Sequence, residues 1–405
     1  AVSISGIYII FQIFFLKKYE YLNFPVINIF FIFCLYIFTL SFFSFDVYLS
    51  LTETIFYVRF GFFTIFIYFI LKKYDNFIKY FTATFLLTFI IVFIDAYIQY
   101  FFGYNTIGNV YNGYRLNSFF GSELKLGSYI ARLTPILIGL ILFLYKDTLL
   151  SKIFLVLIII NSSIIVLLAG ERIAFFLLIF YLLTFFILSN IRLINKFLII
   201  IIILPTLTFI LFNNETVKHR MIDTTINQIL NTNNLDYTFL SRSHSDTYKT
   251  AFNMFLDKPL FGVGVKNFRI LCSDPKYFAE FGIVNRANAK HVYLDARETQ
   301  LVNDYGCFTH PHNNYIQLLA ETGVFGFAFI VLFFSIIFII LIKQFFYLFI
   351  PSKKKYILKN YELSFYLAVL LTLFPFIPSG NLFNNWLSII YFLPIGFIFY
   401  FRSLR

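Results

Sequence analysis

The chain has 405 residues, of which 60% are hydrophobic and only 13% are charged. Uncharged apolar stretches long enough to cross a bilayer recur throughout it, which indicates a polytopic membrane protein surrounded by lipids. The formal net charge is +12, but no basic stretch is interleaved with aromatic residues that could stack on bases. We therefore expect no nucleic-acid partner.

The apolar segments favour helices over barrel strands. Strands of a membrane barrel alternate apolar and polar residues, whereas residues 197–212, FLIIIIILPTLTFILF, are apolar on every side. We therefore predict an all-α integral membrane protein with about eleven transmembrane helices. In chain order the predicted spans are 4–16, 26–45, 54–71, 77–102, 127–145, 149–168, 173–189, 197–212, 315–342, 363–379 and 385–401. Because the sequence begins with Ala1 rather than Met, we expect one more helix ahead of it and twelve in the full-length protein.

Lysine and arginine predict the orientation. Short cytoplasmic loops retain an excess of these residues, and one alternating set of loops holds sixteen of them against four acidic residues. The opposite short loops hold only Arg115, Lys125 and Arg172. Residue 1 is therefore expected outside and the C-terminus in the cytoplasm.

The same parity makes residues 213–314 one large external insertion. We predict three parts: N-terminal transmembrane helices in 1–212, a cap loop in 213–314 and C-terminal transmembrane helices in 315–405. Within the cap, NETVKHRMIDTTINQILN and SRSHSDTYKTAFNMFLDKP show helical spacing. Cys272 and Cys307 both lie in the cap, where an oxidising environment permits a disulfide.

Ionisable residues at membrane depth are costly and therefore candidates for function. They are Arg59, Asp95, Arg132, Arg172 and Glu321. Arg59 and Asp95 are expected to pair across helices. Arg172 follows a helix break at Gly170 and stands beside Glu171, so it forms either an ion pair with that neighbour or part of a site.

Three external arginines suggest an anion site. Arg115 lies in a loop that returns to the membrane, Arg172 stands at the outer end of a span, and Arg242 opens a cap helix. A guanidinium group stays charged and directs two donors onto phosphate oxygens.

A histidine stands at the threshold of the predicted span 315–342. An imidazole with an ordinary pKa of ~6.5 suits proton abstraction at neutral pH, which makes His312 a candidate base. Asn313 or Asn314 can cap the helix that follows. Glu321 lies nine positions beyond His312, on the far face of a continuous helix, so we do not pair the two as base and orienting group.

Four motifs together resemble those of the O-antigen ligase and O-antigen polymerase superfamily. They are RLNSFFGSELKLGSY, GERIAF, AFNMFLDKPLFGVGVKNF and HPHNNYIQLLAETGVFG, in that order. The most specific is the H-N-x-Y-x-x-x-x-x-E-x-G pattern from His312 to Gly323. Many relatives carry a Pro-Asn pair where this chain has Ser122 and Glu123.

The resemblance implies a metal-independent glycosyltransferase of C-type architecture at the periplasmic face of the bacterial inner membrane, with no cofactor. Its donor would be a glycan on undecaprenyl diphosphate. By the family pattern His312 is the general base, and Arg172 and Arg242, with Arg115 assisting, hold the pyrophosphate. Asn313, Glu321, Glu171 and Glu123 are expected to support these residues. Direct displacement would invert the anomeric centre.

Several functions stay open at this level. A polymerase joins lipid-linked repeats, whereas a ligase moves a finished glycan onto lipid A core, and the upstream motif favours the polymerase. A metal-dependent C-type glycosyltransferase would use a carboxylate in the first external loop, where Asp46 stands, although the chain has no D-x-D or E-x-D pair. A glycolipid flippase would show repeat symmetry. The sequence indicates no oligomeric state.

Overall fold

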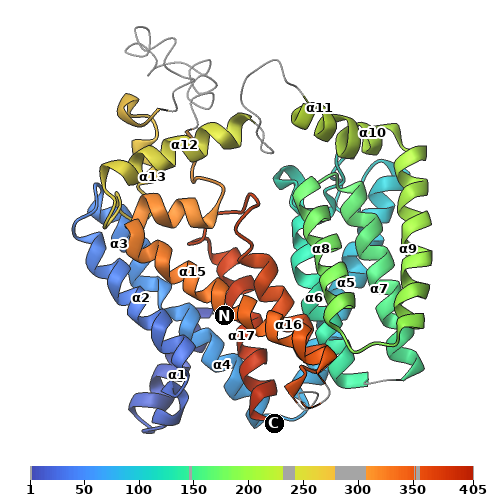
Figure 1. The fold of residues 1–405 in the computed structure, drawn as a ribbon, viewed down its shortest axis with the longest axis horizontal. Helices are drawn as coiled ribbons and strands as arrows, with labels where there is room; N and C mark the ends of the chain where they lie inside the picture. Colours follow the sequence, from blue (N-terminus) through green and yellow to red (C-terminus); the bar gives the residue numbers. More distant parts are fainter. Residues whose placement is uncertain are drawn as a thin grey trace. The chain divides into compact units, whose positions relative to one another are not determined.

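The computed structural model describes residues 2–145, 148–230, 242–278, 307–350, 352 and 356–404. These residues form helices (Figure 1), with one isolated β-bridge between Tyr104 and Val110. The longer helices are α1 (Val2–Phe14), α2 (Pro25–Ser41), α3 (Val47–Tyr57), α4 (Arg59–Lys73), α5 (Phe77–Phe102), α6 (Leu126–Tyr145), α7 (Leu149–Leu168), α8 (Arg172–Leu188), α9 (Leu193–Asn213), α12 (Arg242–Asp257), α15 (Asn314–Phe349), α16 (Asn360–Thr372) and α17 (Asn385–Ser403). The shorter turns are η1 (Tyr19–Leu22), η2 (Ser118–Glu123), α10 (Glu215–Lys218), η3 (His219–Asp223), α11 (Thr224–Leu230), α13 (Phe268–Leu271) and η4 (Pro275–Tyr277).

The all-helical, polytopic class agrees with the prediction. A helix lies at each of the eleven predicted spans, and α5 and α7 have the predicted limits. Within the described residues, seven helices are long and apolar enough to cross a membrane, with α3 and α4 counted as one segment, Val47–Lys73. The segments at α1, α2 and α8 are apolar but shorter. The number of spans and the external position of the cap therefore stay predictions.

The chain divides into two compact units, which we describe separately. The first comprises Ala1–Ile67, Asn231–Ile336 and Leu373–Gly396, as far as these are described. The second comprises Tyr68–Leu230, Ile337–Thr372 and Phe397–Arg405. The division predicted at residues 212 and 314 follows membrane topology rather than compactness, and it stays a prediction.

In the second unit, helix α6 is the centre of the bundle. It packs against α7, α8 and α16, and its residues from Ile130 to Ile141 are buried almost without interruption. Polar contacts reinforce the packing, since the Ser364 hydroxyl donates to the Pro135 carbonyl at 2.6 Å and lies 2.7 Å from the Tyr181 hydroxyl. At one end of this unit, α10 and α11 run across the ends of α8 and α9 (Figure 1). The sequence of the predicted cap therefore begins as part of this bundle.

In the first unit, α15 has a break, whereas we predicted a continuous helix. Gly323 has φ 66° and ψ −166°, and Figure 1 shows the two parts of the helix at an angle. At the break, backbone groups of α15 form hydrogen bonds with the preceding loop instead of within the helix. The Val263 amide donates to the Ala320 carbonyl at 3.0 Å, and the Val324 amide donates to the Pro259 carbonyl at 2.9 Å. The loop at residues 258–264 is thus fixed to the helix by backbone bonds.

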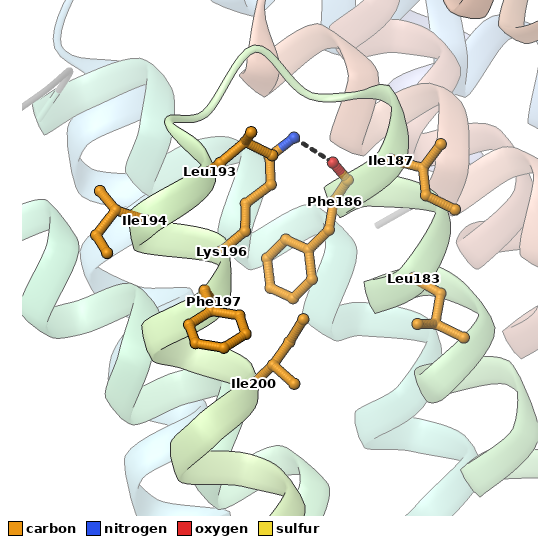
Figure 2. Close-up of a pocket in the computed structure, with 8 residues that line it drawn as sticks. All are labelled: Leu183, Phe186, Ile187, Leu193, Ile194, Lys196, Phe197 and Ile200. Atoms are coloured by element: carbon orange, nitrogen blue, oxygen red, sulfur yellow. Dashed lines mark hydrogen bonds between the residues drawn. The ribbon is translucent and has the colours of Figure 1, made fainter.

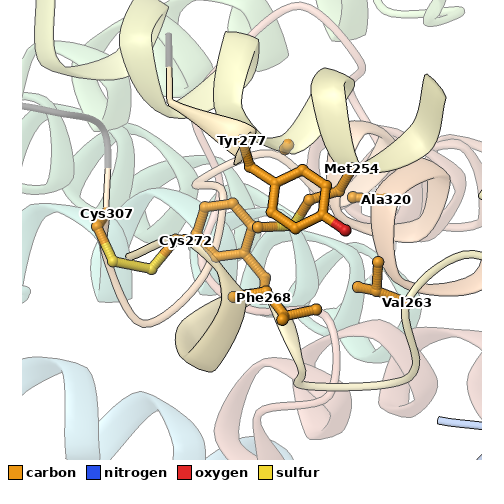
Figure 3. Close-up of a cluster of buried hydrophobic side chains, with 9 residues drawn as sticks. Met254, Val263, Phe268, Cys272, Tyr277, Cys307 and Ala320 are labelled. Carbon is orange, nitrogen blue, oxygen red and sulfur yellow. A yellow bond between two sulfur atoms is a disulfide. The ribbon is translucent and has the colours of Figure 1, made fainter. Parts of the chain in front are cut away.

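A small apolar core holds the second half of the predicted cap together. It joins α12, the 263–272 segment and the start of α15, and Figure 3 shows its side chains around Phe268 and Met254. A disulfide between Cys272 and Cys307 closes one side of this core, with a Cα–Cα distance of 4.9 Å. Since Cys307 lies five residues before His312, the bond restrains the chain that leads to the histidine.

The Gly323 break should tolerate no side chain. A Cβ on Gly323 would lie 2.2 Å from the Leu260 carbonyl oxygen and would also sit on a left-handed backbone. We expect Gly323→Ala to lower the free energy of unfolding by ~2 kcal/mol or more, as measured by thermal or denaturant unfolding in detergent. Gly108→Ala is the matched control, because Gly108 has φ 88° but no neighbour within 4 Å. Equal losses in the two variants would refute the close contact.

Candidate functional site

The turn between α7 and α8 is built on a left-handed glycine, where the sequence placed a helix break. Helix α7 ends at Leu168, Gly170 has φ 64°, and α8 begins at Arg172. A Cβ on Gly170 would lie 2.8 Å from Cδ of Arg220. The turn therefore requires glycine both for its backbone and for the side chain packed on it.

Glu171 anchors this turn to the start of α6. Its carboxylate accepts hydrogen bonds from the backbone amides of Gly127 at 2.8 Å and Ser128 at 3.0 Å. These amides belong to the first turn of α6, where the partial positive charge of the helix favours a carboxylate. The same carboxylate lies 3.7 Å from the Arg115 guanidinium. Glu171 thus stabilises a helix end and one arginine together.

Three arginines gather at this turn, and we call them the arginine cluster: Arg115, Arg172 and Arg220. Arg115 donates to the Leu124 carbonyl at 2.9 Å, and Arg220 donates through Nε to the Gly170 carbonyl at 2.6 Å. Arg172 lies 3.4 Å from the Thr225 hydroxyl. Arg220 interacts electrostatically with both of the other arginines. Two members were predicted, whereas Arg220 was missed.

Like charge and partial burial act on Arg115. Its side chain is 20% exposed, and burial lowers the pKa of its guanidinium. Glu171 opposes this pKa shift, and Arg220 adds to it. Arginine stays protonated despite such shifts. The guanidinium groups of the cluster therefore repel one another, and a bound anion would reduce that repulsion.

The loop that carries Arg115 is fixed to α5 by two buried polar residues. Asp95 accepts hydrogen bonds from Asn105, Thr106 and Ser118. Gln99 accepts from the Ser118 amide at 2.7 Å. We expected Asp95 to pair with Arg59, but its carboxylate holds this loop instead.

The described contacts of Arg59 and Glu123 are with residues outside the arginine cluster. Arg59 donates to the side-chain oxygen of Asn385 and lies over the Phe60 ring at 5.2 Å, in the first unit. Glu123 is 63% exposed and pairs with Lys125. No contact of Glu123 with the cluster is described, and its supporting role stays a prediction.

His312 lies in the first unit, directly before α15. It adopts a left-handed backbone with φ 55°, and its carbonyl accepts from the Ser379 amide at 2.7 Å. The next residue, Asn313, caps the helix by accepting from the amides of Tyr315 and Ile316. Its side-chain amide also donates to the Pro375 carbonyl at 2.7 Å. These bonds hold the backbone of His312 and Asn313 in place, and with it the position from which the imidazole extends.

Two further imidazoles lie close to His312, and we call His244, His310 and His312 the histidine cluster. Ring centroids lie 5.4 Å apart for His244 and His312, and 4.2 Å apart for His310 and His312. Burial, and to a smaller extent the charge of His244, lower the pKa of His312 to about 4. The Tyr248 hydroxyl donates to the His312 carbonyl at 3.4 Å. His312 is therefore neutral at physiological pH, with a pKa well below the 6.5 assumed from sequence.

Glu321 serves the backbone rather than His312. Its side chain is fully buried and accepts from Gln317 at 3.0 Å. Its backbone carbonyl accepts from the Gly264 amide at 2.9 Å. Glu321 thus helps to seat the loop that precedes α13 on α15.

Two other predicted residues are Arg242 and Asp46. Arg242 begins α12, which carries His244, but its side chain lies outside the described part of the structure. Asp46 caps α3 by accepting from the Leu49 amide at 2.9 Å. Among the described residues, no three His, Cys, Asp or Glu side chains group as metal ligands.

A hollow of about 610 Å³ lies between α8 and α9, and its lining is mostly apolar (Figure 2). Its polar member, Lys196, donates to the Phe186 and Ser189 carbonyls. These carbonyls end α8 and have no partner within the helix. Lys196 is therefore a helix cap, and the other lining residues are apolar: Leu183, Phe186, Ile187, Leu193, Ile194, Phe197 and Ile200.

Residues 153–331 match the sequence model of the family described as O-antigen ligase. The resemblance to the O-antigen ligase and O-antigen polymerase superfamily is confirmed. The matched region includes Arg172, Arg242 and His312, whereas Arg115 precedes it. A search of curated proteins finds no match.

The family match supports an O-antigen ligase/polymerase-type membrane enzyme and implies glycosyltransferase-type activity. It also supports a multi-pass protein of the inner membrane. A glycan or lipid-linked substrate follows from the same family. These statements cover the class of enzyme, its membrane and its class of substrate.

The disulfide should stabilise the segment that carries His312. It closes a loop across a sequence separation of 35 residues, for which loop-closure entropy predicts ~4 kcal/mol. We expect the double variant Cys272→Ser, Cys307→Ser to unfold at a lower denaturant concentration than the oxidised protein. Reductant should have the same effect on the oxidised protein and none on the double variant, which serves as the control. An unchanged midpoint in the double variant would contradict a stabilising role.

Proposed function

We propose that this enzyme transfers a glycan from undecaprenyl diphosphate to a sugar hydroxyl of an acceptor at the periplasmic face, inverting the anomeric centre and using no metal ion. The observation that carries the proposal is the arginine cluster, a gathering of like charges. Two of its members, Arg172 and Arg220, lie in the matched region, residues 153–331. Such a site favours a multiply charged anion, and the diphosphate of the donor has that charge.

The arginine cluster would act on the leaving group. When the bond between the anomeric carbon and the diphosphate breaks, both electrons stay with the diphosphate and its negative charge increases. Fixed guanidinium groups stabilise that increase without reorganisation during the reaction. Arg115 and Arg172 take this role, and Arg242 joins them by the family pattern.

His312 would act on the acceptor. The acceptor oxygen bonds to the anomeric carbon, and its proton passes to a ring nitrogen of His312. The low pKa of His312 keeps this imidazole unprotonated before the reaction. Attack from the face opposite the leaving diphosphate inverts the anomeric centre.

The choice between polymerase and ligase depends on the acceptor, and we propose the polymerase. A decisive assay supplies purified enzyme with lipid-linked repeats, with and without lipid A core. A product ladder without lipid A core is expected for a polymerase, whereas a product that appears only with lipid A core would assign a ligase.

In the same assay, His312→Ala should reduce transfer by ~10²- to 10⁴-fold, the usual contribution of a general base. His219→Ala is the matched control, because His219 is exposed and is not a member of the histidine cluster. Membrane insertion and thermal stability should be unchanged in both variants. Full activity of His312→Ala in reconstituted membranes would remove the assignment of the base.

The pH profile should report the burial of His312. Because the base acts in its neutral form and its pKa is lowered to about 4, transfer should be lost only as pH falls towards 4. We therefore expect the acidic limb of kcat/KM near pH 4, since this quantity reports the free enzyme. The residual rate of His312→Ala should lack that limb. A limb near ~6.5, the ordinary histidine value, would show that His312 is solvated or is not the base.

A further inference from the structure

A third arginine faces the same turn as the two that were predicted. Arg220 lies in the π-helical turn η3, between α10 and α11. A π-turn inserts one extra residue and changes the direction in which side chains leave the helix. Here the π-turn carries Arg220, whose side chain contacts the Gly170 turn.

Two contacts hold the Arg220 guanidinium in place. Its Nε donates to the Gly170 carbonyl at 2.6 Å, and its centre lies 4.6 Å from the Tyr114 ring centroid. A cation at this distance over an aromatic ring is attracted by the ring face. None of the described residues accepts a hydrogen bond from the two terminal nitrogens. The group is therefore positioned on one edge and open to an acceptor on the other.

The charges around it point to a ligand. Arg220 acts electrostatically on both Arg115 and Arg172, and each of these interactions is between like charges. Glu171 already accepts hydrogen bonds from Gly127 and Ser128 as well as pairing with Arg115. Placing Arg220 beside two other arginines costs free energy that no described carboxylate of the cluster offsets.

We propose that Arg220 is a direct ligand of the donor diphosphate, a third guanidinium that binds the anion together with Arg115 and Arg172. This inference rests on the proposed function and adds a residue to its binding site. The terminal nitrogens of Arg220 would donate to phosphate oxygens, while Nε stays on Gly170. Tyr114 is then a positioning residue, since it supports the guanidinium without touching the anion.

The test measures diphosphate binding by the full chain in lipid nanodiscs. Inorganic pyrophosphate is the probe in one arm, and undecaprenyl diphosphate is the probe in the other, so that a soluble anion and a lipid-linked one are distinguished. Arg220→Gln should weaken the binding of both by about 10- to 100-fold, the loss expected for charge-assisted hydrogen bonds. Lys218→Gln is the matched control, because it removes the same charge from an exposed position two residues away. It should change the affinity by less than ~3-fold, as expected for a screened surface charge.

A lysine variant separates direct binding from a structural role. Arg220→Lys keeps the charge but cannot keep both the Gly170 contact and a donor to the anion. A direct ligand predicts that Lys recovers part of the affinity lost in Arg220→Gln. If Lys and Gln fail equally, with a matching fall in melting temperature, Arg220 only holds the turn and the proposal is overturned. Unchanged affinity in Arg220→Gln overturns it as well.

Arg172→Gln distinguishes failure of this inference from failure of the proposed function. If Arg172→Gln weakens pyrophosphate binding and Arg220→Gln does not, only the role of Arg220 is wrong. If neither variant changes the binding of either probe and His312→Ala transfers glycan normally, the proposed function itself is wrong.

Discussion

The left-handed backbone of Gly170 is the constraint on which the second unit's polar site depends. The turn exposes the Ala169 and Gly170 carbonyls on one side, where Arg115 and Arg220 donate to them. It also directs Glu171 towards the amides at the start of α6. One residue thus determines where two guanidinium groups and one carboxylate lie. Because a Cβ would meet the Arg220 side chain, the same residue must be glycine for steric reasons too.

Buried ionisable groups in this protein fall into two kinds, and their partners separate them. Asp95 accepts hydrogen bonds from neutral donors of the loop that follows α5, so its carboxylate holds that loop in place. In the arginine cluster, by contrast, Arg115 lies near a second cation, Arg220, as well as near the carboxylate of Glu171. The first arrangement is complete without a ligand, whereas the second is stabilised further when an anion binds. This difference in partners is a better guide to function than burial alone.

Sequence reasoning located the helices well because membrane spans are long apolar runs, and the limits of α5 and α7 follow directly from them. It missed the break in α15, since the left-handed backbone of Gly323 depends on bonds to a loop some sixty residues earlier. Asp95 was assigned the wrong partner for the same reason. Its donors are short polar residues of a loop, which carry no charge pattern.

The candidate site was predictable in part for a related reason. The motifs marked Arg172 and His312, but nothing near Arg220 distinguished it from the neighbouring Lys218 and His219 in a polar helix. The helical spacing of the segment was visible in the sequence, but the π-turn at His219–Asp223, where Arg220 lies, appears only in the structure. The position of the Arg220 side chain depends on the Gly170 carbonyl as an acceptor, which only the folded bundle supplies.

The histidine and arginine clusters place different demands on the reaction. A base whose pKa is about 4 is weak, so it withdraws little charge from the acceptor hydroxyl before the new bond forms. The positive end of α15, which begins just after His312, also disfavours an imidazolium there. In the proposed transfer, most of the driving force would then come from departure of the diphosphate, and proton transfer would follow as positive character develops on the attacking oxygen. On this argument the guanidinium groups carry the larger share of the barrier reduction, and the histidine determines where the proton goes.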